Sequence, residues 1–287
     1  MLAVCKHELR MYFQTLTAYV FGAFLLVVVG IGAMLYNLQA AVSNFEYVLS
    51  FSSLVFAVIV PILTMRTLAE ERRQRTDQLL YSLPLTTTQV ILGKFAALLV
   101  VFLIPLAVIS AYPLIFAQFG DVYLPTSYGS LFAVFLMGAA LLAIGVFISS
   151  LTDNQGLAAG ISIAAILFNY YSVSLSEYVS STAIGTVIAL AVLVFALGAV
   201  IRYLTRNELL AYGVCLVLTA VICVIAFVDA ASFEGLLPDI MRGLSMFERL
   251  NTFVSGVFDL AAVVYYLSVT AFFLFLSIQS LEKRRYN

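Results

Sequence analysis

The chain has 287 residues, of which 63% are hydrophobic and only 10% are charged, and its formal net charge is −1. A soluble domain is typically about 45–50% apolar and about 25% charged, and a water-soluble fold of this length could not bury so much apolar surface. The composition therefore excludes a soluble enzyme, a nucleic-acid-binding protein and a disordered scaffold. It predicts an integral membrane protein, which lies in the lipid bilayer and binds no nucleic acid.

The first 15 residues predict a short helix that lies in the membrane interface. Its apolar residues recur at intervals of three and four: Leu2, Cys5, Leu9, Tyr12 and Leu16. Its other face is polar: Lys6, His7, Glu8, Arg10 and Gln14. This pattern is typical of an amphipathic helix at a bilayer surface, although a frayed start of the first membrane span would give a similar pattern.

Eight continuously apolar windows are long enough to cross a bilayer, whose core of about 30 Å needs roughly 20 helical residues. They cover residues 16–36, 47–65, 95–117, 128–151, 155–173, 182–201, 209–228 and 260–279. Because the windows do not alternate in polarity, they predict helices rather than barrel strands. The fold class that we expect is all-α: a single polytopic membrane domain over residues 1–287, with about eight spans.

The positive charges predict the orientation of these spans. If the N-terminus is cytoplasmic, twelve of the fourteen cations fall on the cytoplasmic side, as the positive-inside rule requires. These are Lys6, Arg10, Arg66, Arg72, Arg73, Arg75, Lys94, Arg202, Arg206, Lys283, Arg284 and Arg285. Both termini are then cytoplasmic. No Asp, Glu or Lys lies within the eight windows, which argues against a proton pathway through the chain.

The predicted cytoplasmic segment of residues 66–94 has a charged part followed by an apolar part. Residues 66–77 hold four cations and three anions, and Glu71 precedes Arg75 by four residues, the favourable order in a helix. Leu79, Leu80 and Leu83 then form an apolar ridge that ends at Pro84. Such a ridge in water favours a protein partner, although a solvated loop would also fit the charges.

The next helix is expected to begin at one of three threonines, residues 86–88, whose side chains can cap it. We expect Lys94 to extend its amine from this helix to the membrane surface. On the outer side, residues 229–259 place apolar residues at intervals of three to four, with Pro238 near a helix start. This spacing predicts extracellular amphipathic helices.

The sequence offers no site for a nucleotide or a metal ion. Gly93 and Lys94 are followed by Phe95 and lack the earlier glycine of a phosphate-binding loop. Cys5, Cys215 and Cys223 show no metal-ligand spacing. We therefore expect no cofactor in this chain, no ATP hydrolysis by it, and an energy source on another chain.

Three stretches carry a resemblance to a known family. Residues 70–95 resemble the first cytoplasmic loop of ABC-2 type transporter permeases, and residues 147–155 resemble the tight cytoplasmic turn of that family between spans four and five. Residues 246–259, Tyr265, Tyr266 and residues 281–285 resemble its gliding-motility and nitrous-oxide-reductase-maturation branch. The family core has six spans, so the extra hairpin at about residues 182–228 departs from the pattern.

The resemblance implies a type V exporter-like membrane domain that pairs with a second permease copy or a similar chain. It implies a coupling helix that docks on a separate ABC ATPase subunit, and that subunit would carry ATP and Mg²⁺. The residues of the coupling helix are Thr76, Asp77, Gln78, Leu79, Leu80, Tyr81, Ser82 and Leu83. It also implies a gate-like helix that leads into the coupling helix: Glu70, Glu71, Arg72, Arg73 and Arg75. A second contact with the ATPase is expected at Thr152, Asp153, Asn154 and Gln155.

The expected function is that of a permease subunit of an ATP-binding cassette exporter in the bacterial cytoplasmic membrane. A membrane anchor or scaffold for a cytosolic ATPase would use the same apolar ridge without transporting anything. A secondary carrier or an intramembrane enzyme is disfavoured by the absence of charged residues from the spans.

Overall fold

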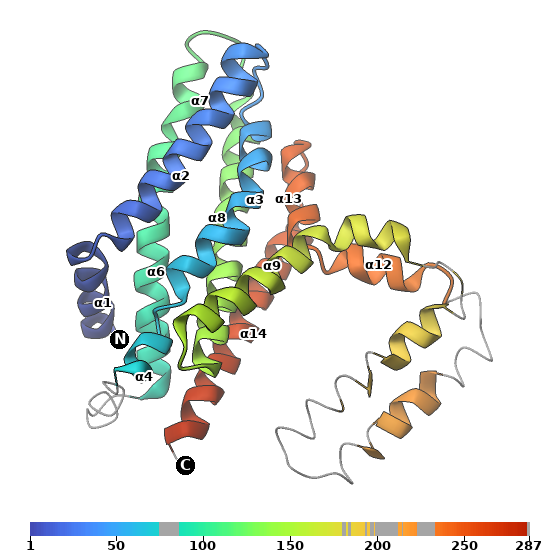
Figure 1. Ribbon diagram of the computed structural model, residues 1–287. Coiled ribbons are helices and arrows are strands. Elements are labelled where there is room, and N and C mark those ends of the chain that lie inside the picture. Colours follow the sequence, from blue (N-terminus) through green and yellow to red (C-terminus); the bar gives the residue numbers. More distant parts are fainter. Residues whose placement is uncertain are drawn as a thin grey trace. The chain divides into compact units, whose positions relative to one another are not determined.

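The computed structural model describes residues 1–74, 86–179, 182, 185–192, 194–195, 198, 212–213, 215–222 and 233–285. Every long regular element in these ranges is a helix, which confirms the all-α prediction (Figure 1). The chain divides into two compact units. Met1–Tyr170 and Arg249–Asn287 form the first, and Tyr171–Glu248 form the second.

Six helices in the described ranges are long and apolar enough to cross a membrane. They are Thr17–Gln39, Glu46–Arg73, Thr87–Phe116, Leu124–Leu151, Gln155–Tyr178 and Leu260–Arg284. Each corresponds to one predicted window. The other two windows, 182–201 and 209–228, lie largely outside the described residues, and their described parts include helical residues at 185–192 and 215–222.

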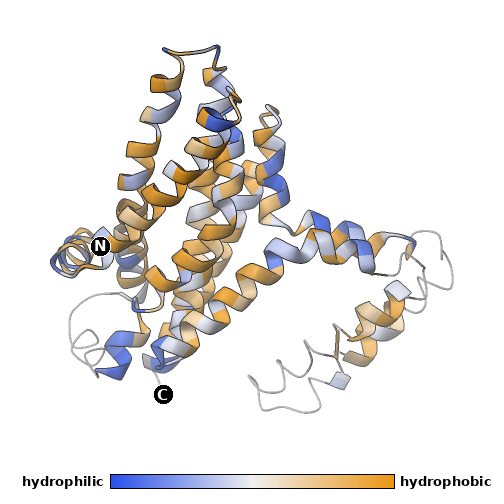
Figure 2. Ribbon diagram, turned by 45° about the horizontal axis from the view of Figure 1, so that its top comes forward, coloured by the Kyte–Doolittle hydropathy of each residue, from blue (hydrophilic) through white to orange (hydrophobic). Residues whose placement is uncertain are grey.

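The first unit contains most of these helices, some of them divided. The first span is α2 (Thr17–Ala33) followed by the π-helix η1 (Met34–Gln39), and the second is α3 (Glu46–Thr64) followed by the short α4 (Ala69–Arg73). The third is α6 (Thr87–Ile109) followed by α7 (Ala111–Phe116). α8 (Leu124–Leu151), α9 (Gln155–Tyr178) and α14 (Leu260–Arg285) form the others. Figure 2 shows hydrophobic residues along these helices and hydrophilic residues at α4 and near the C-terminus.

The predicted N-terminal helix is α1 (Leu2–Gln14), which buries Tyr12 from the predicted apolar face and Glu8 from the predicted polar face. Glu8 and Tyr12 are buried, whereas Leu2 is 84% exposed and Leu16 is 77% exposed. α1 packs against α6. The buried face therefore includes a carboxylate, because α6 presents a lysine to it.

α8 lies at the centre of the first unit and packs against α3, α6 and α14. Glycines allow two of these helices to approach closely. A Cβ atom added at Gly145 would lie 2.7 Å from the Cβ of Thr64 on α3, and one added at Gly138 would collide with the ring of Phe102 on α6. Small residues at such positions are the usual means of close helix packing in membranes.

Gly145→Ala should therefore lower the stability of the protein by about 1–2 kcal/mol, because overpacking outweighs the gain in helix propensity. Gly129→Ala on the same helix is the matched control. A Cβ at Gly129 meets no atom within 4 Å, so this substitution should leave stability unchanged or raise it. The midpoint of unfolding in an SDS titration, followed by circular dichroism, measures both changes. Equal effects of the two substitutions would contradict the close packing of α8 on α3.

The segment predicted to form extracellular amphipathic helices contains α12 (Leu236–Gly243) and α13 (Met246–Val254). Gly235 precedes α12 with φ 76°, a left-handed conformation that glycine adopts without strain. Pro238 lies in the first turn of α12, as predicted. Within the second unit, Arg242 Nε donates to Ser176 Oγ at 3.2 Å, and Ser172 Oγ donates to the carbonyl of Met241 at 3.3 Å.

Candidate functional site

A buried lysine joins three helices at one end of the first unit. Lys94 Nζ on α6 lies 2.5 Å from Glu8 Oε1 on α1 and 2.7 Å from Glu71 Oε1 on α4. The side chains of Lys94 and Glu8 are 1% and 4% exposed, and that of Glu71 is 19% exposed. The expectation that Lys94 would extend to the membrane surface is wrong. Two charge-assisted hydrogen bonds inside the protein replace the hydration that its amine would have found there.

α6 begins at the predicted threonines, ahead of the apolar window 95–117, so Lys94 lies within the helix. Thr86 Oγ1 accepts a hydrogen bond from the backbone N–H of Gln89 at 3.2 Å, so Thr86 is the capping threonine among the three predicted. Next to it, Thr87 Oγ1 donates to Glu282 Oε1 on α14 at 2.8 Å. In the first turn of α6, Thr87 is therefore buried against α14, whereas Thr88 and Gln89 are exposed.

Tyr12 extends the environment of the lysine along α1. Its hydroxyl lies 3.4 Å from Thr67 Oγ1, in the turn that joins α3 to α4. Burial raises the pKa of the Tyr12 phenol above its ordinary value, and the neighbouring carboxylates of Glu8 and Glu71 raise it further. Tyr12 is therefore neutral and adds no charge to the ion pairs beside it.

α4, the predicted gate-like helix, is held on its other side by the end of α8. Arg72 Nη1 donates to the carbonyl of Ser150 and lies 3.9 Å from Asp153 Oδ1. Ser149 Oγ accepts hydrogen bonds from the backbone N–H groups of Leu68 and Ala69, at 3.2 and 3.1 Å. α4 has no capping side chain of its own, so Ser149 of another helix satisfies its first N–H groups. A helix of five residues depends on such contacts, because it cannot be stable alone.

The C-terminal end of α14 completes this group of contacts. Arg284 Nη1 lies 2.9 Å from Asp153 Oδ1, and its Nη2 donates to the carbonyl of Leu151 at 2.9 Å. Ser280 Oγ donates to the carbonyl of Ser150 at 3.1 Å. We call these residues together the polar cluster: Glu8, Glu71, Arg72, Lys94, Ser149, Ser150, Asp153, Ser280 and Arg284. The polar cluster joins α1, α4, α6, α8 and α14.

The predicted second contact, residues 152–155, forms the turn between α8 and α9. Asn154 Oδ1 accepts hydrogen bonds from the backbone N–H groups of Gly156 and Leu157, at 2.9 and 3.4 Å, and so caps α9. Thr152 Oγ1 accepts from the N–H of Asn154 at 3.2 Å. Asp153, 67% exposed, pairs with the two arginines of the polar cluster, and Gln155 begins α9. The turn is thus closed by its own hydrogen bonds and lies beside α4.

Of the predicted gate-like residues, Glu71 and Arg72 belong to the polar cluster. Glu70 Oε1 accepts a hydrogen bond from Gln74 at 3.2 Å, and Arg73 is exposed. Arg75 and all eight residues of the predicted coupling helix, 76–83, lie outside the described residues. Their docking role therefore stays a prediction.

Of the nine residues of the polar cluster, sequence reasoning predicted Glu71, Arg72 and Asp153 as site residues. It missed the other six: Glu8, Lys94, Ser149, Ser150, Ser280 and Arg284. One signal for Glu8 was present: it lies four residues from Tyr12, on the face that also holds Val4. No local pattern points to Ser149, since its partners precede it by about 80 residues.

A buried carboxylate also lies at the first residue of α3, one position outside the predicted window. Glu46 is 2% exposed, and its Oε1 accepts a hydrogen bond from Ser127 Oγ at 2.8 Å. With Lys94, which also lies just outside its predicted window, it corrects the expectation that the spans hold no buried charged residue. That expectation therefore no longer argues against a secondary carrier.

Among the described residues, no group of three or more His, Cys, Asp and Glu side chains could hold a metal ion. The polar cluster contains cations as well as carboxylates, and its groups bond one another. What this arrangement can do is transmit a displacement of α4 to four other helices.

Comparison with known proteins identifies the family. The profile of the ABC-2 family transporter proteins matches residues 34–182, which are 149 of the 287 residues. The match covers α4, the predicted coupling helix and the turn at residues 152–155. No protein of curated function matches the chain. The chain belongs to the ABC-2 transporter family and is a multi-pass membrane permease of an ABC transporter, the membrane component rather than the ATPase.

Proposed function

We propose that this permease is an exporter subunit driven by separate ABC ATPase subunits, which carry ATP and Mg²⁺. It would work as a pair, with a second copy or a similar chain, in the bacterial cytoplasmic membrane. The ATPase would dock on Thr76–Leu83 and on Thr152–Gln155, and both termini would lie on the same, cytoplasmic side. The distribution of the cations, twelve of fourteen on that side, supports the orientation.

The observation that carries this proposal is the attachment of α4 on two sides. Glu71 binds the buried Lys94 on one side, and Arg72 binds the end of α8 on the other. α4 ends at Arg73, three residues before Thr76, the first residue of the predicted coupling helix. A push on that segment would therefore reach α1 and α6 through Lys94, and α8 and α14 through Arg72 and Asp153. A solvated loop would need neither attachment.

Within the family, we propose the gliding-motility and nitrous-oxide-reductase-maturation branch, on the resemblance of residues 246–259, Tyr265, Tyr266 and residues 281–285. In that assignment α12 and α13 would cover the outer end of the translocation path. Their amphipathic sequences, with apolar residues every three to four positions, support this position.

The test is to replace Leu79, Leu80 and Leu83 together by serine in the full chain, expressed with an affinity tag in its own host. We expect the wild-type protein to co-purify with a nucleotide-binding subunit and Mg²⁺-dependent ATPase activity. The triple variant should lose both while its membrane insertion is unchanged, because the apolar docking surface is gone. The matched control replaces two exposed leucines that the topology places outside, Leu38 and Leu244, by serine.

Retention of the ATPase by the triple variant would contradict the docking role. The ATPase could also bind through the ridge and hydrolyse ATP in proteoliposomes at a rate that no candidate cargo changes. That result would identify the chain as an anchor or scaffold instead. Uphill transport by the purified permease alone would overturn the proposal altogether.

A further inference from the structure

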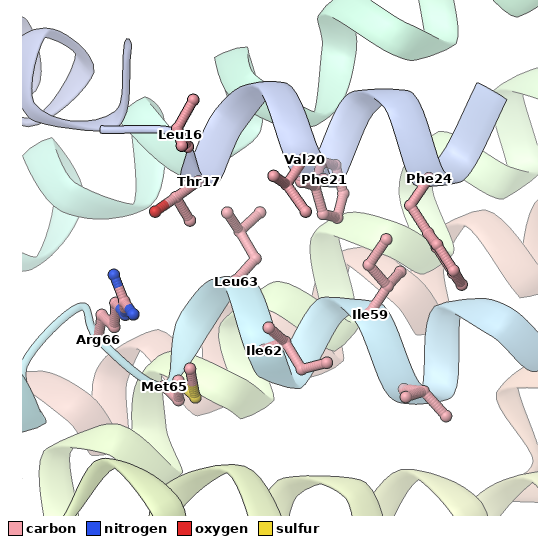
Figure 3. A pocket seen from close by; sticks show the side chains of 11 residues that line it. Leu16, Thr17, Val20, Phe21, Phe24, Ile59, Ile62, Leu63, Met65 and Arg66 are labelled. Carbon is pink, nitrogen blue, oxygen red and sulfur yellow. The ribbon is translucent and has the colours of Figure 1, made fainter. Parts of the chain in front are cut away.

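An apolar groove runs along the first unit between α2 and α3. Its volume is about 430 Å³, within the range of sites for small molecules, about 300–1,000 Å³. Val20 and Phe24 line it from α2, and Ile59 and Ile62 line it from α3 (Figure 3). Most of these side chains are also partly exposed on the helix surface, so the groove opens to the surroundings of the spans. In a membrane protein those surroundings are lipid.

One end of the groove is polar. Thr17, the first residue of α2, and Arg66, just beyond the last turn of α3, lie at this end (Figure 3). Thr17 brings a hydroxyl group, both a donor and an acceptor, to this end of the groove, 3.2 Å from Thr15 Oγ1. The first turn of α2 contains no acidic residue. The polar end therefore offers hydrogen-bond donors and positive charge.

Arg66 is exposed, and across the described part of the chain it has no hydrogen bond or ion pair. The two carboxylates of the nearby α4 are otherwise engaged. Glu71 binds Lys94, and Glu70 accepts a hydrogen bond from Gln74. Arg66 therefore lies at one end of the apolar groove as a cation that no described carboxylate pairs with, and it can bind an anion.

We infer that this groove binds an anionic phospholipid, with an acyl chain along α2 and α3 and the phosphate on Arg66 and Thr17. A lipid fits both halves of the site, whereas a soluble anion would leave the apolar half empty. Basic sites between membrane helices on the cytoplasmic side are the usual sites for anionic head groups. The inference goes beyond the proposed export function, and it uses only the orientation that places Arg66 on the cytoplasmic side.

The chain contains no tryptophan, so one introduced tryptophan reports on one position. Phe24→Trp places the reporter in the groove, and Phe272→Trp on α14 is the matched control outside it. Phe24 and Phe272 are 50% and 56% exposed. Each variant of the full chain is reconstituted in vesicles containing brominated phosphatidylglycerol or brominated phosphatidylcholine at equal mole fraction, and quenching of the fluorescence is measured.

At position 24 we expect brominated phosphatidylglycerol to bind about fivefold more strongly than brominated phosphatidylcholine. One cation near the membrane surface contributes about 1 kcal/mol to the binding of an anionic lipid, which corresponds to this ratio. At position 272 the two lipids should quench equally. Arg66→Gln in the Phe24→Trp protein should abolish the preference, whereas Lys283→Gln, which removes an exposed cation from α14, should retain it.

Equal quenching by the two lipids at position 24 would overturn the inference, because the groove would then hold bulk lipid only. The inference would also be overturned if both lipids quenched the tryptophan at position 272 and neither quenched the one at position 24. The groove would then be occupied by a protein segment or by a second copy of the chain. A preference that survives Arg66→Gln would remove the assigned head-group contact. Circular dichroism and gel filtration show that each variant is folded before its quenching is compared.

Discussion

Replacing Lys94 by methionine should lower the free energy of unfolding by about 3–5 kcal/mol, the usual cost of breaking a buried ion pair by removing one partner. The substitution leaves Glu8 and Glu71 as two carboxylates with no cation between them. Methionine has nearly the length of lysine, so loss of packing contributes little. Glu8→Gln should cost much less, because Lys94 keeps Glu71 as a partner. The loss of Lys94 should therefore cost more than the loss of the Glu8 charge, because one cation neutralises two carboxylates.

Thermal unfolding of the detergent-solubilised chain, followed by the loss of its monodisperse gel-filtration peak, measures these differences. Lys283→Met is the matched control, because Lys283 is an exposed lysine and should tolerate the change. Methionine at positions 8, 71 and 94 together should recover most of the stability, since an apolar group of similar volume can replace a buried ion pair. A Lys94→Met protein as stable as the wild type, or less impaired than Glu8→Gln, would refute the buried ion pairs.

Composition and periodicity were sufficient to predict the membrane helices, because a span must be apolar over about 20 residues wherever it lies in the fold. Six of the eight predicted windows are helices of the required length, and the turn at residues 152–155 is where the sequence placed it. The capping threonine of α6 was also within the predicted set of three. These features depend on residues that are neighbours in the chain.

The polar cluster could not be predicted in the same way, because its partners are distant in sequence. Glu8 and Lys94 are 86 residues apart, and Arg72 and Ser150 are 78 apart. A hydropathy window treats each charged residue as a cost and therefore places it at a membrane surface. That cost is offset when another helix presents the opposite charge, and only the packing of α1 on α6 reveals it. Glu46 escaped notice for the same reason, since its hydrogen-bond donor Ser127 is 81 residues away.

The second large effect is expected at Arg72. Arg72→Gln removes the charged donor to the carbonyl of Ser150 and the pairing with Asp153, so α4 should separate more often from α8. A hydrogen bond to a charged group contributes about 1.5–3 kcal/mol, which corresponds to an increase of roughly ten- to hundredfold in the opening of α4. Arg73→Gln is the matched control. It removes the same charge from the next residue of the same helix, where the side chain is exposed.

Hydrogen–deuterium exchange of the full chain in nanodiscs measures this opening directly. The amides of Leu68 and Ala69 are the reporters, because Ser149 accepts their hydrogen bonds only while α4 is attached. If α4 transmits movement from the ATPase, Arg72→Gln should also lower the ATPase rate of the co-purified complex without releasing the partner, whereas Arg73→Gln should leave it unchanged. Faster exchange with a normal ATPase rate would make Arg72 a purely structural residue. Unchanged exchange would show that the contacts of Ser149 and Glu71 are enough to hold α4 in place.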